Sequence, residues 1–231
     1  SAGTAIAGNL TVAGGTATLQ AADQIADGKN VVVTSGTLDV ASFNDTVNGV
    51  QITGGTITGT TGALTSTTAF DLQAGTVSAI LGGTAGANKT TAGTVTLSKT
   101  NTYTGATTVS AGTLTLGHAT NTLADASTVV VSGGTLDLGG NADTVAGVQQ
   151  TGGTIQNGTL TSTTAFDMQA GTASANLAGA VGLDKTTAGT TTLSGTNTYT
   201  GTTTVSAGNL NLNSAGTAIA GNLTVAGGTA T

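Results

Sequence analysis

The sequence predicts an all-β protein, a parallel β-helix (β-solenoid) of about 12 coils of roughly 19 residues each. Three observations carry this prediction. A Gly-Thr or Gly-Asn dipeptide recurs every 18 to 22 residues, and apolar and polar residues alternate around it. The composition, with 38 Gly, no Pro and only 2% aromatic residues among 231, also suits short strands joined by many turns.

The glycine of the recurring dipeptide marks one bend in each coil. A glycine suits such a bend because a left-handed backbone conformation costs it little. The markers along the chain are Gly15, Gly36, Gly55, Gly75, Gly93, Gly112, Gly134, Gly153, Gly171, Gly189, Gly208 and Gly228.

The residues on either side of each marker predict two strands per coil. Two residues after the marker, nearly every position is apolar, and three residues before it most are apolar, whereas the intervening positions carry Thr, Ser, Asp or Asn. Such alternation is typical of strands with one buried face. Stacked coils would then form aliphatic ladders in the core, with members that include Val33, Leu38, Ile57, Leu97, Val109, Leu114, Leu136, Leu193 and Leu210.

Two longer repeats overlie the coils. The stretch 31–116 recurs at 129–212, so five coils form one superunit, and the superunits span about 31–128 and 129–224. Residues 1–18 are identical to residues 214–231, which gives a period of 213 residues plus an overlap of 18. We expect a single continuous solenoid over 1–231, about 55 Å long at about 4.8 Å per coil.

A sequence motif in each superunit resembles a known repeat. Residues 96–105 read TLSKTNTYTG and continue to Leu114, and residues 192–201 read TLSGTNTYTG and continue to Leu210. This pattern resembles the autotransporter-associated β-strand repeat of bacterial passenger regions. The resemblance implies a right-handed parallel β-helix outside a Gram-negative cell, and right-handedness is also the general rule for parallel crossovers.

The net charge and the length of the apolar runs argue against two kinds of interaction, with nucleic acid and with the membrane interior. The net charge is −6 and there is no Arg, so nucleic acid is not an expected partner. No apolar run approaches the about 20 residues of a membrane helix, so we expect no membrane insertion in this segment.

The sequence also predicts that the chain is not an enzyme, and no catalytic, cofactor or metal residue is nominated. Glycoside hydrolysis needs two carboxylates about 5–10 Å apart. There is no Glu, and no two Asp are expected in one column of adjacent coils. His118 is the single histidine and has no second imidazole with which to hold a metal.

Alignment on the marker glycines predicts two cross-coil charge pairs, Asp71 with Lys89 and Asp167 with Lys185. Each pair would contribute about 0.2–1 kcal/mol and help to set the register of the strands.

The Thr column directly after the markers is the most regular expected surface feature. It is compatible with an ice-binding face, although exposed strands favour Thr in any case.

These observations favour a structural extracellular protein: a fibre, a stalk or the rod of a giant adhesin, at a bacterial cell surface or in a secreted fibre. Its expected partners are other copies or further repeats of the same chain, end to end. The alternative is an adhesive module that recognises glycans, neighbouring cells or fibres through the Thr face or two loop insertions, residues 22–29 and 118–127. An ice-binding protein and a polysaccharide-degrading enzyme are the less favoured alternatives.

Overall fold

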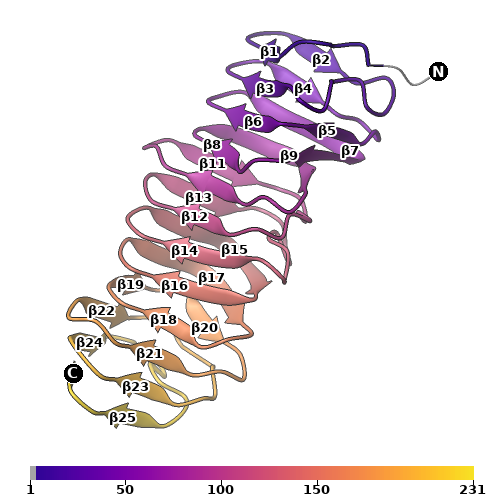
Figure 1. The fold of residues 1–231 in the computed structure, drawn as a ribbon. Coiled ribbons are helices and arrows are strands. Elements are labelled where there is room, and N and C mark those ends of the chain that lie inside the picture. Colours follow the sequence, from indigo (N-terminus) through magenta and orange to yellow (C-terminus); the bar gives the residue numbers. More distant parts are fainter. Residues whose placement is uncertain (1–3) are drawn as a thin grey trace.

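A computed structural model describes residues 4–231, so residues 1–3 of the predicted solenoid lie outside it. The predicted fold class is confirmed: residues 4–231 form parallel strands and turns, with no helix, and coil follows coil along one axis. The result is an elongated rod with the two chain ends at opposite ends (Figure 1).

Two long parallel sheets run the length of the rod, and each coil contributes one strand to each of them. The first sheet contains, in order, β1 (Leu10–Val12), β3 (Asn30–Val33), β6 (Gly49–Ile52), β8 (Phe70–Leu72), β10 (Ala87–Lys89), β12 (Thr107–Val109), β14 (Thr128–Val131), β16 (Gly147–Gln150), β18 (Phe166–Met168), β21 (Leu183–Lys185), β23 (Thr203–Val205) and β25 (Leu223–Val225).

The second sheet is built in the same way, and two short strands pair beside it: β5 (Asp45–Val47) with β7, and β20 (Asn176–Ala178) with β17. Its main strands are, in order, β2 (Thr16–Thr18), β4 (Thr37–Asp39), β7 (Thr56–Ser66), β9 (Gly75–Gly82), β11 (Thr94–Leu97), β13 (Thr113–Leu116), β15 (Thr135–Val145), β17 (Thr154–Ser162), β19 (Gly171–Ala173), β22 (Thr190–Leu193), β24 (Asn209–Leu212) and β26 (Thr229–Ala230).

The marker glycines form the bend between the two sheets, and stacking makes several of them obligatory. Gly55 has φ 69°, and a Cβ added there would collide with the carbonyl oxygen of Gly36 in the preceding coil. Gly153, with φ 66°, meets Gly134 in the same way. Both the backbone conformation and the close approach of the next coil therefore require glycine.

The core lies between the sheets and is continuous along the rod. All nine nominated ladder residues are buried, with no side-chain exposure: Val33, Leu38, Ile57, Leu97, Val109, Leu114, Leu136, Leu193 and Leu210. Strands alternate between buried and partly exposed residues, as in β3 and β13, because successive side chains point to opposite faces.

The alignment on marker glycines is wrong at one coil of each superunit, where the ladder slips by two residues. Val77 pairs with Leu97 and not with Val95, and Ala173 pairs with Leu193 and not with Thr191. The cause is a longer bend between the sheets. Asp71 and Thr76 lie five residues apart in one coil. Their register partners in the next coil, Asn88 and Thr96, lie eight residues apart.

The same slip recurs between the coils of β19 and β22 in the second superunit, so it belongs to the repeat.

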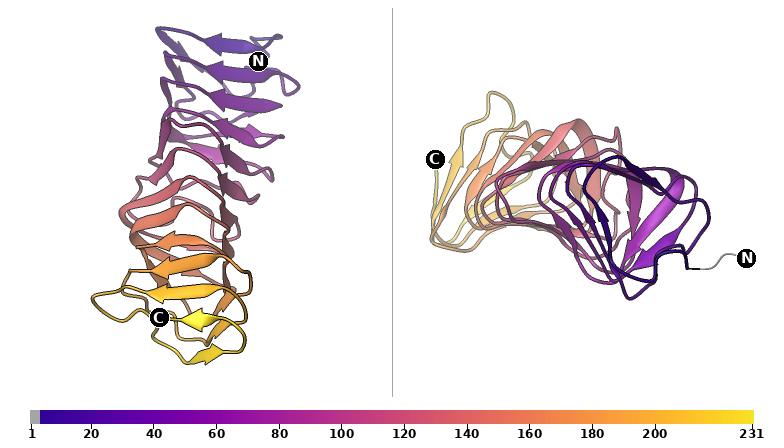
Figure 2. Two further views of the ribbon diagram at one scale, coloured as in Figure 1. Left: turned by 90° about the vertical axis from the view of Figure 1, so that its left-hand side faces the viewer. Right: turned by 90° about the horizontal axis from the view of Figure 1, so that it is seen from above.

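The coils also turn relative to one another along the rod, as seen from above in Figure 2. Within residues 4–231, no helix is long and apolar enough to cross a membrane.

Candidate functional surface

The nominated charge pairs are not formed, because the two lysines point into the core. Asp71 pairs in register with Asn88, and Asp167 with Asp184, so each lysine stands one residue further on. The expected Asp71–Lys89 and Asp167–Lys185 neighbours therefore lie on opposite faces of the first sheet. The error follows from the longer bend, which moves the marker glycine out of alignment in both lysine coils.

Lys89 and Lys185 are fully buried, and the carbonyl groups of the bends take up their ammonium groups. Lys89 Nζ donates to the carbonyls of Thr91 and, at 3.3 Å, of Ala111 in the next coil. Lys185 makes the same contacts with Thr187 and Ala207. Burial lowers the pKa of both lysines, and the charge of Asp71 opposes this shift at Lys89.

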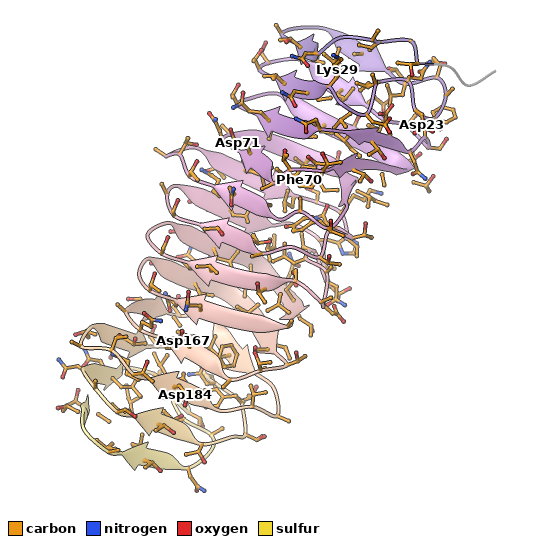
Figure 3. The ribbon with its side chains drawn as sticks, in the orientation of Figure 1. Asp23, Lys29, Phe70, Asp71, Asp167 and Asp184 are labelled. Atoms are coloured by element: carbon orange, nitrogen blue, oxygen red, sulfur yellow. The ribbon has the colours of Figure 1, made fainter. Side chains whose placement is uncertain are left out.

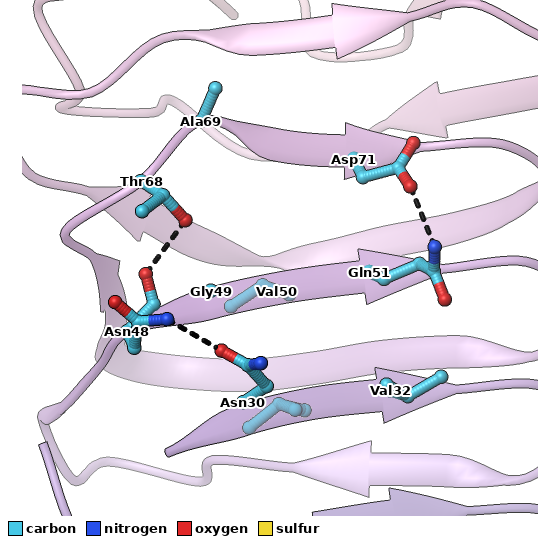
Figure 4. Close-up of a pocket in the computed structure, with 10 residues that line it drawn as sticks. Asn30, Val32, Asn48, Gly49, Val50, Gln51, Thr68, Ala69 and Asp71 are labelled. Atoms are coloured by element: carbon cyan, nitrogen blue, oxygen red, sulfur yellow. Dashed lines mark hydrogen bonds between the residues drawn. The ribbon is translucent and has the colours of Figure 1, made fainter. Parts of the chain in front are cut away.

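The outer face of the first sheet carries a shallow hollow of about 300 Å³ over β3, β6 and β8 (Figure 4). The missing side chain of Gly49 opens it, and Asn30, Asn48 and Thr68 line one end. At the other end Asp71 Oδ2 accepts hydrogen bonds from the side-chain amides of Gln51 (2.7 Å) and Gln73 (2.9 Å). The hollow is thus lined by valines, and side-chain amides, a hydroxyl and a hydrogen-bonded carboxylate surround them.

A second hollow of about 310 Å³ repeats the first over β14, β16 and β18. Gly147 opens it, and Asp167 Oδ2 accepts from the amides of Gln149 (2.7 Å) and Gln169 (2.9 Å). Asp71, Asp167 and Asp184 lie along the same side of the rod (Figure 3). The glycine and the glutamine-bound aspartate therefore recur once per superunit, whereas Asn30 and Asn48 of the first hollow are replaced by Thr128 and Ala146 in the second.

The two loop insertions nominated for binding are held by buried aspartates of the following coil. Asp143 Oδ2 accepts from the backbone N–H groups of Thr122 (2.7 Å) and Leu123 (3.1 Å). Asp45 does the same for Gln24 and Ile25. In both aspartates the second carboxylate oxygen is buried without a hydrogen-bond partner.

This burial raises the pKa of both carboxyl groups. The pKa of Asp143 rises to about 6, since desolvation outweighs its backbone hydrogen bonds, and the charge of Asp125 adds to the shift. Asp45 is shifted in the same direction by burial, with smaller contributions from the charges of Asp23 and Asp27.

An asparagine in each NTYTG motif joins three consecutive coils. Asn101 Oδ1 accepts from the N–H of Leu81 in the preceding coil (2.9 Å), and its Nδ2 donates to the carbonyl of Thr122 in the following coil (2.8 Å). Asn197 makes the equivalent contacts with Leu177 (2.9 Å) and Ala218 (2.7 Å). The motif is thus a structural staple.

The tyrosines of the same motif are core residues. Tyr103 and Tyr199 are fully buried, and their hydroxyls hydrogen-bond to Thr107 (2.9 Å) and Thr203 (2.6 Å). Their rings pack against Phe70 and Phe166, with centroids 5.8 and 6.0 Å apart. Burial raises the pKa of both hydroxyls, and neither ring is available to stack on a sugar.

The Thr column also follows the slipped register. Thr76 pairs with Thr96 and Thr172 with Thr192, two positions beyond the marker alignment. Asp137 and Gln156 follow Thr115 in the adjoining column. The Thr residues therefore form short runs offset from each other along the rod.

The expectation that no two Asp share a column is wrong at one place, because Asp167 and Asp184 are register partners on the outer face.

His118 lies half-buried in its loop, where Nδ1 is 2.6 Å from the carbonyl of Thr120. Among residues 4–231, no three His, Asp or other potential metal ligands cluster.

Sequence reasoning missed the buried aspartates, the bridging asparagines and the two hollows. The signal that could have found them is their recurrence: Asp45 with Asp143, Asn101 with Asn197, and Gly49 with Gly147 each occupy equivalent places in the repeat.

Two unbroken parallel sheets, stapled coil to coil by buried side chains, define a β-solenoid of the elongated repeat class. The sequence model of the passenger-associated-transport-repeat family matches three stretches of the chain, residues 88–116, 110–138 and 183–212. The chain therefore carries passenger repeats, as its NTYTG motifs predict, and these repeats indicate an autotransporter passenger region with a secreted or surface-exposed location. Comparisons with curated proteins and with solved structures gave no significant match.

Proposed function

We propose that this segment is a structural rod: part of an extracellular fibre, stalk or giant adhesin stem at a bacterial surface. The observation that carries the proposal is the continuity of both sheets from β1 and β2 to β25 and β26. Every coil hydrogen-bonds to its neighbours along the axis, and the apolar core has no break between superunits. Such a molecule resists bending and sets a fixed distance between its ends.

The surface chemistry supports a structural role over a catalytic one. Aspartates are the only acidic residues, and Asp71 and Asp167 each use one oxygen to accept hydrogen bonds from two glutamines. Two of the buried charged groups, Asp143 and Lys89, hydrogen-bond to backbone groups within the wall of the rod. We propose that the segment is not an enzyme and that its partners are like chains or repeats.

Electron microscopy of the native material, with a power spectrum of the particles, tests the rod. Unbranched rods with a layer line at about 4.8 Å along their axis are the expected result, since this is the spacing of neighbouring strands. Compact particles without axial extension would overturn the proposal.

A second candidate function, adhesion, is favoured by the repeated hollows at Gly49 and Gly147. Two sites with the same Asp and Gln groups, about five coils apart, would be spaced by about 24 Å and could engage a polymer of regular structure, such as a glycan, at both points. Small-residue walls with fixed amide and carboxylate groups suit the hydroxyl groups of sugars.

A glycan array probed with the chain tests adhesion. Bound glycans should be lost from the variant Gly49→Val/Gly147→Val, whose new side chains fill both hollows, and retained by Thr108→Val, which lies on the same face outside them. Equal binding by both variants would exclude the hollows as the glycan site.

A further inference from the structure

The aspartate in each hollow uses one carboxylate oxygen within the protein and leaves the other free. In the first hollow the side-chain amides of Gln51 and Gln73 both donate to Oδ2 of Asp71, at 2.7 and 2.9 Å. Oδ1 of Asp71 and the amide oxygens of both glutamines accept no hydrogen bond from the described residues. Figure 4 shows the second carboxylate oxygen directed away from Gln51. These three side chains, which we call the acceptor triad, therefore present oxygen acceptors to a ligand.

The second hollow contains the same triad. Gln149 and Gln169 donate to Oδ2 of Asp167 at 2.7 and 2.9 Å, and Oδ1 is again unused within the described part of the chain. Both hollows also share a threonine, Thr68 in the first and Thr164 in the second. Each threonine hydroxyl donates its hydrogen to the backbone carbonyl before the glycine, at 2.8 Å, so its lone pairs remain as acceptors. The shared groups therefore suit a ligand that is rich in hydrogen-bond donors.

The charge of the triads is not compensated on the outer face of the first sheet. Lys89 and Lys185 belong to strands of this sheet but are buried on its inner side. Among the described residues, no lysine lines either hollow. The outward residues in register from β3 to β23 form a column with three aspartates and no cation: Val32, Gln51, Asp71, Asn88, Thr108, Val130, Gln149, Asp167, Asp184 and Thr204. The face therefore complements a positively charged partner.

Each hollow has an apolar floor between its polar ends. Partly exposed valines line it, Val32 in the first hollow and Val130 in the second. The glycine keeps the floor open, since a Cβ at Gly49 would lie 3.0 Å from Oγ1 of Thr68. The apolar face of a sugar ring can lie on such a floor, with hydroxyl groups toward the threonine and a charged group toward the aspartate.

We propose that the ligand of both hollows is a glycan that carries free amino groups, with one ammonium group at each acceptor triad. An ammonium has donors and no acceptor, so it matches the free carboxylate oxygen and the two amide oxygens of the triad. Its charge also offsets that of the aspartate. Sulfated or uronic-acid glycans would bring a second negative charge to the same place and should not bind. This inference rests on the adhesion proposed above and specifies the class of glycan.

One polymer chain can engage both triads. Asp71 and Asp167 lie five strands apart in the first sheet, or about 24 Å. A polymer of amino sugars that lies along the rod reaches both aspartates, and its second contact is then intramolecular. Oligomers that reach only one hollow should therefore bind more weakly.

The test compares two forms of one polymer, an oligomer of glucosamine with free amino groups and the same oligomer after N-acetylation. Binding of each to the 231-residue chain is measured by titration calorimetry at mildly acidic pH, where the free amines are protonated. We expect the free-amine form to bind about three- to tenfold more tightly, because exposed charge pairs contribute modestly, and we expect added salt to reduce this preference.

Paired variants identify the contact. In Asp71→Asn/Asp167→Asn each new asparagine keeps an acceptor oxygen for the glutamine amides but has no charge, so both polymers should bind with about equal affinity. Asp27→Asn/Asp125→Asn, at exposed loop positions, removes the same net charge and is the matched control. The control should keep its preference for free amines, because the triads and not the net charge of −6 determine it.

Equal binding of both polymers by the unaltered chain, lost in Gly49→Val/Gly147→Val, would overturn the ammonium contact and leave adhesion at the hollows standing. A preference that survives in Asp71→Asn/Asp167→Asn, or disappears in the loop control, would show unspecific attraction and also contradict the inference. Binding of neither polymer rejects the inference, whereas the glycan array decides adhesion separately. A lysine peptide that competes as strongly as the amino sugar would show that the sugar is not recognised, and would rule out a glycan as the ligand.

Discussion

Asp143 shows at the scale of one residue how the rod holds its irregular parts. Its carboxylate closes a loop of the preceding coil by accepting two backbone N–H groups, while its second oxygen remains buried and unpaired. Hydrogen bonds to the charged form lower a carboxyl pKa and desolvation raises it, and here desolvation is the larger effect. The site is therefore structurally useful and electrostatically unfavourable at neutral pH.

The stability of the protein should depend on pH through this residue. The pKa of Asp143 is raised to about 6 from 3.8, so the folded state binds its proton more tightly than the unfolded chain. Stability contributed by this group is full below about pH 3.8, falls as pH rises to about 6, and stays about 3 kcal/mol lower above that.

Asp143→Asn keeps an acceptor for Thr122 and Leu123 but cannot ionise. We expect the variant to lose the part of the fall in unfolding free energy between pH 4 and 6 that Asp143 contributes, while Asp45, whose pKa burial also raises, keeps its own part; urea denaturation at each pH measures both. Asp184→Asn, on the outer face, is the matched control and should retain the fall. A variant profile parallel to that of the unaltered chain would contradict the assignment.

The candidate residues differ in how much of the surrounding sequence determines their burial and contacts. Ladder residues such as Leu114 follow from alternation within one coil, so sequence alone predicts their burial. The partners of Lys89 and Asp71 depend on the length of a bend, and a one-residue error in register moves a side chain to the other face of the sheet. The bridging role of Asn101 depends on the coils before and after it, which no pattern within its own coil contains.

At the scale of elements, the bend between β10 and β11 is an irregular feature of the first superunit, besides the register shift between β7 and β9. It is longer than the bend before it, the ladders slip there by two residues, and Lys89 fills its interior. The ammonium lies so close to Gly112 that a Cβ at that glycine would be 2.6 Å from Nζ. The buried ammonium group of Lys89 donates hydrogen bonds to carbonyl groups that do not take part in strand pairing.

Removal of both internal cations should change the response of stability to alkaline pH. Because burial lowers the pKa of Lys89 and Lys185 below 10.5, the unfolded chain holds these protons to higher pH, and stability should rise as pH increases toward 10.5. Lys89→Met/Lys185→Met should lose that rise in denaturant titrations. Lys29→Met/Lys99→Met removes the same charge from partly exposed positions and should keep it.

Strand positions were predictable because each strand is specified by its own alternation and by the glycine that ends it. The slip between β9 and β11 was not, since it depends on how three additional residues in a bend are accommodated against the neighbouring coil. An internal repeat in a sequence gives the number of coils reliably, but it fixes their mutual register only where the bends are equal in length.

At the scale of the whole molecule, each coil contacts mainly the coils next to it, so stability should be local along the axis. The two aromatic pairs provide a matched test, because Phe70 packs on Tyr103 in one superunit and Phe166 on Tyr199 in the other. Both phenylalanines are fully buried. Replacement of either by alanine removes the same contacts at two different places in the rod.

Phe70→Ala should cost about 3–5 kcal/mol locally and accelerate amide hydrogen exchange in the coils around β8 to β12, with little change around β18 to β23. Phe166→Ala should produce the reverse pattern. The measurement is hydrogen exchange followed by mass spectrometry of peptides from both superunits. Equal acceleration of both superunits by either variant would show that the rod unfolds as one cooperative unit, in conflict with nearest-neighbour coupling between its coils.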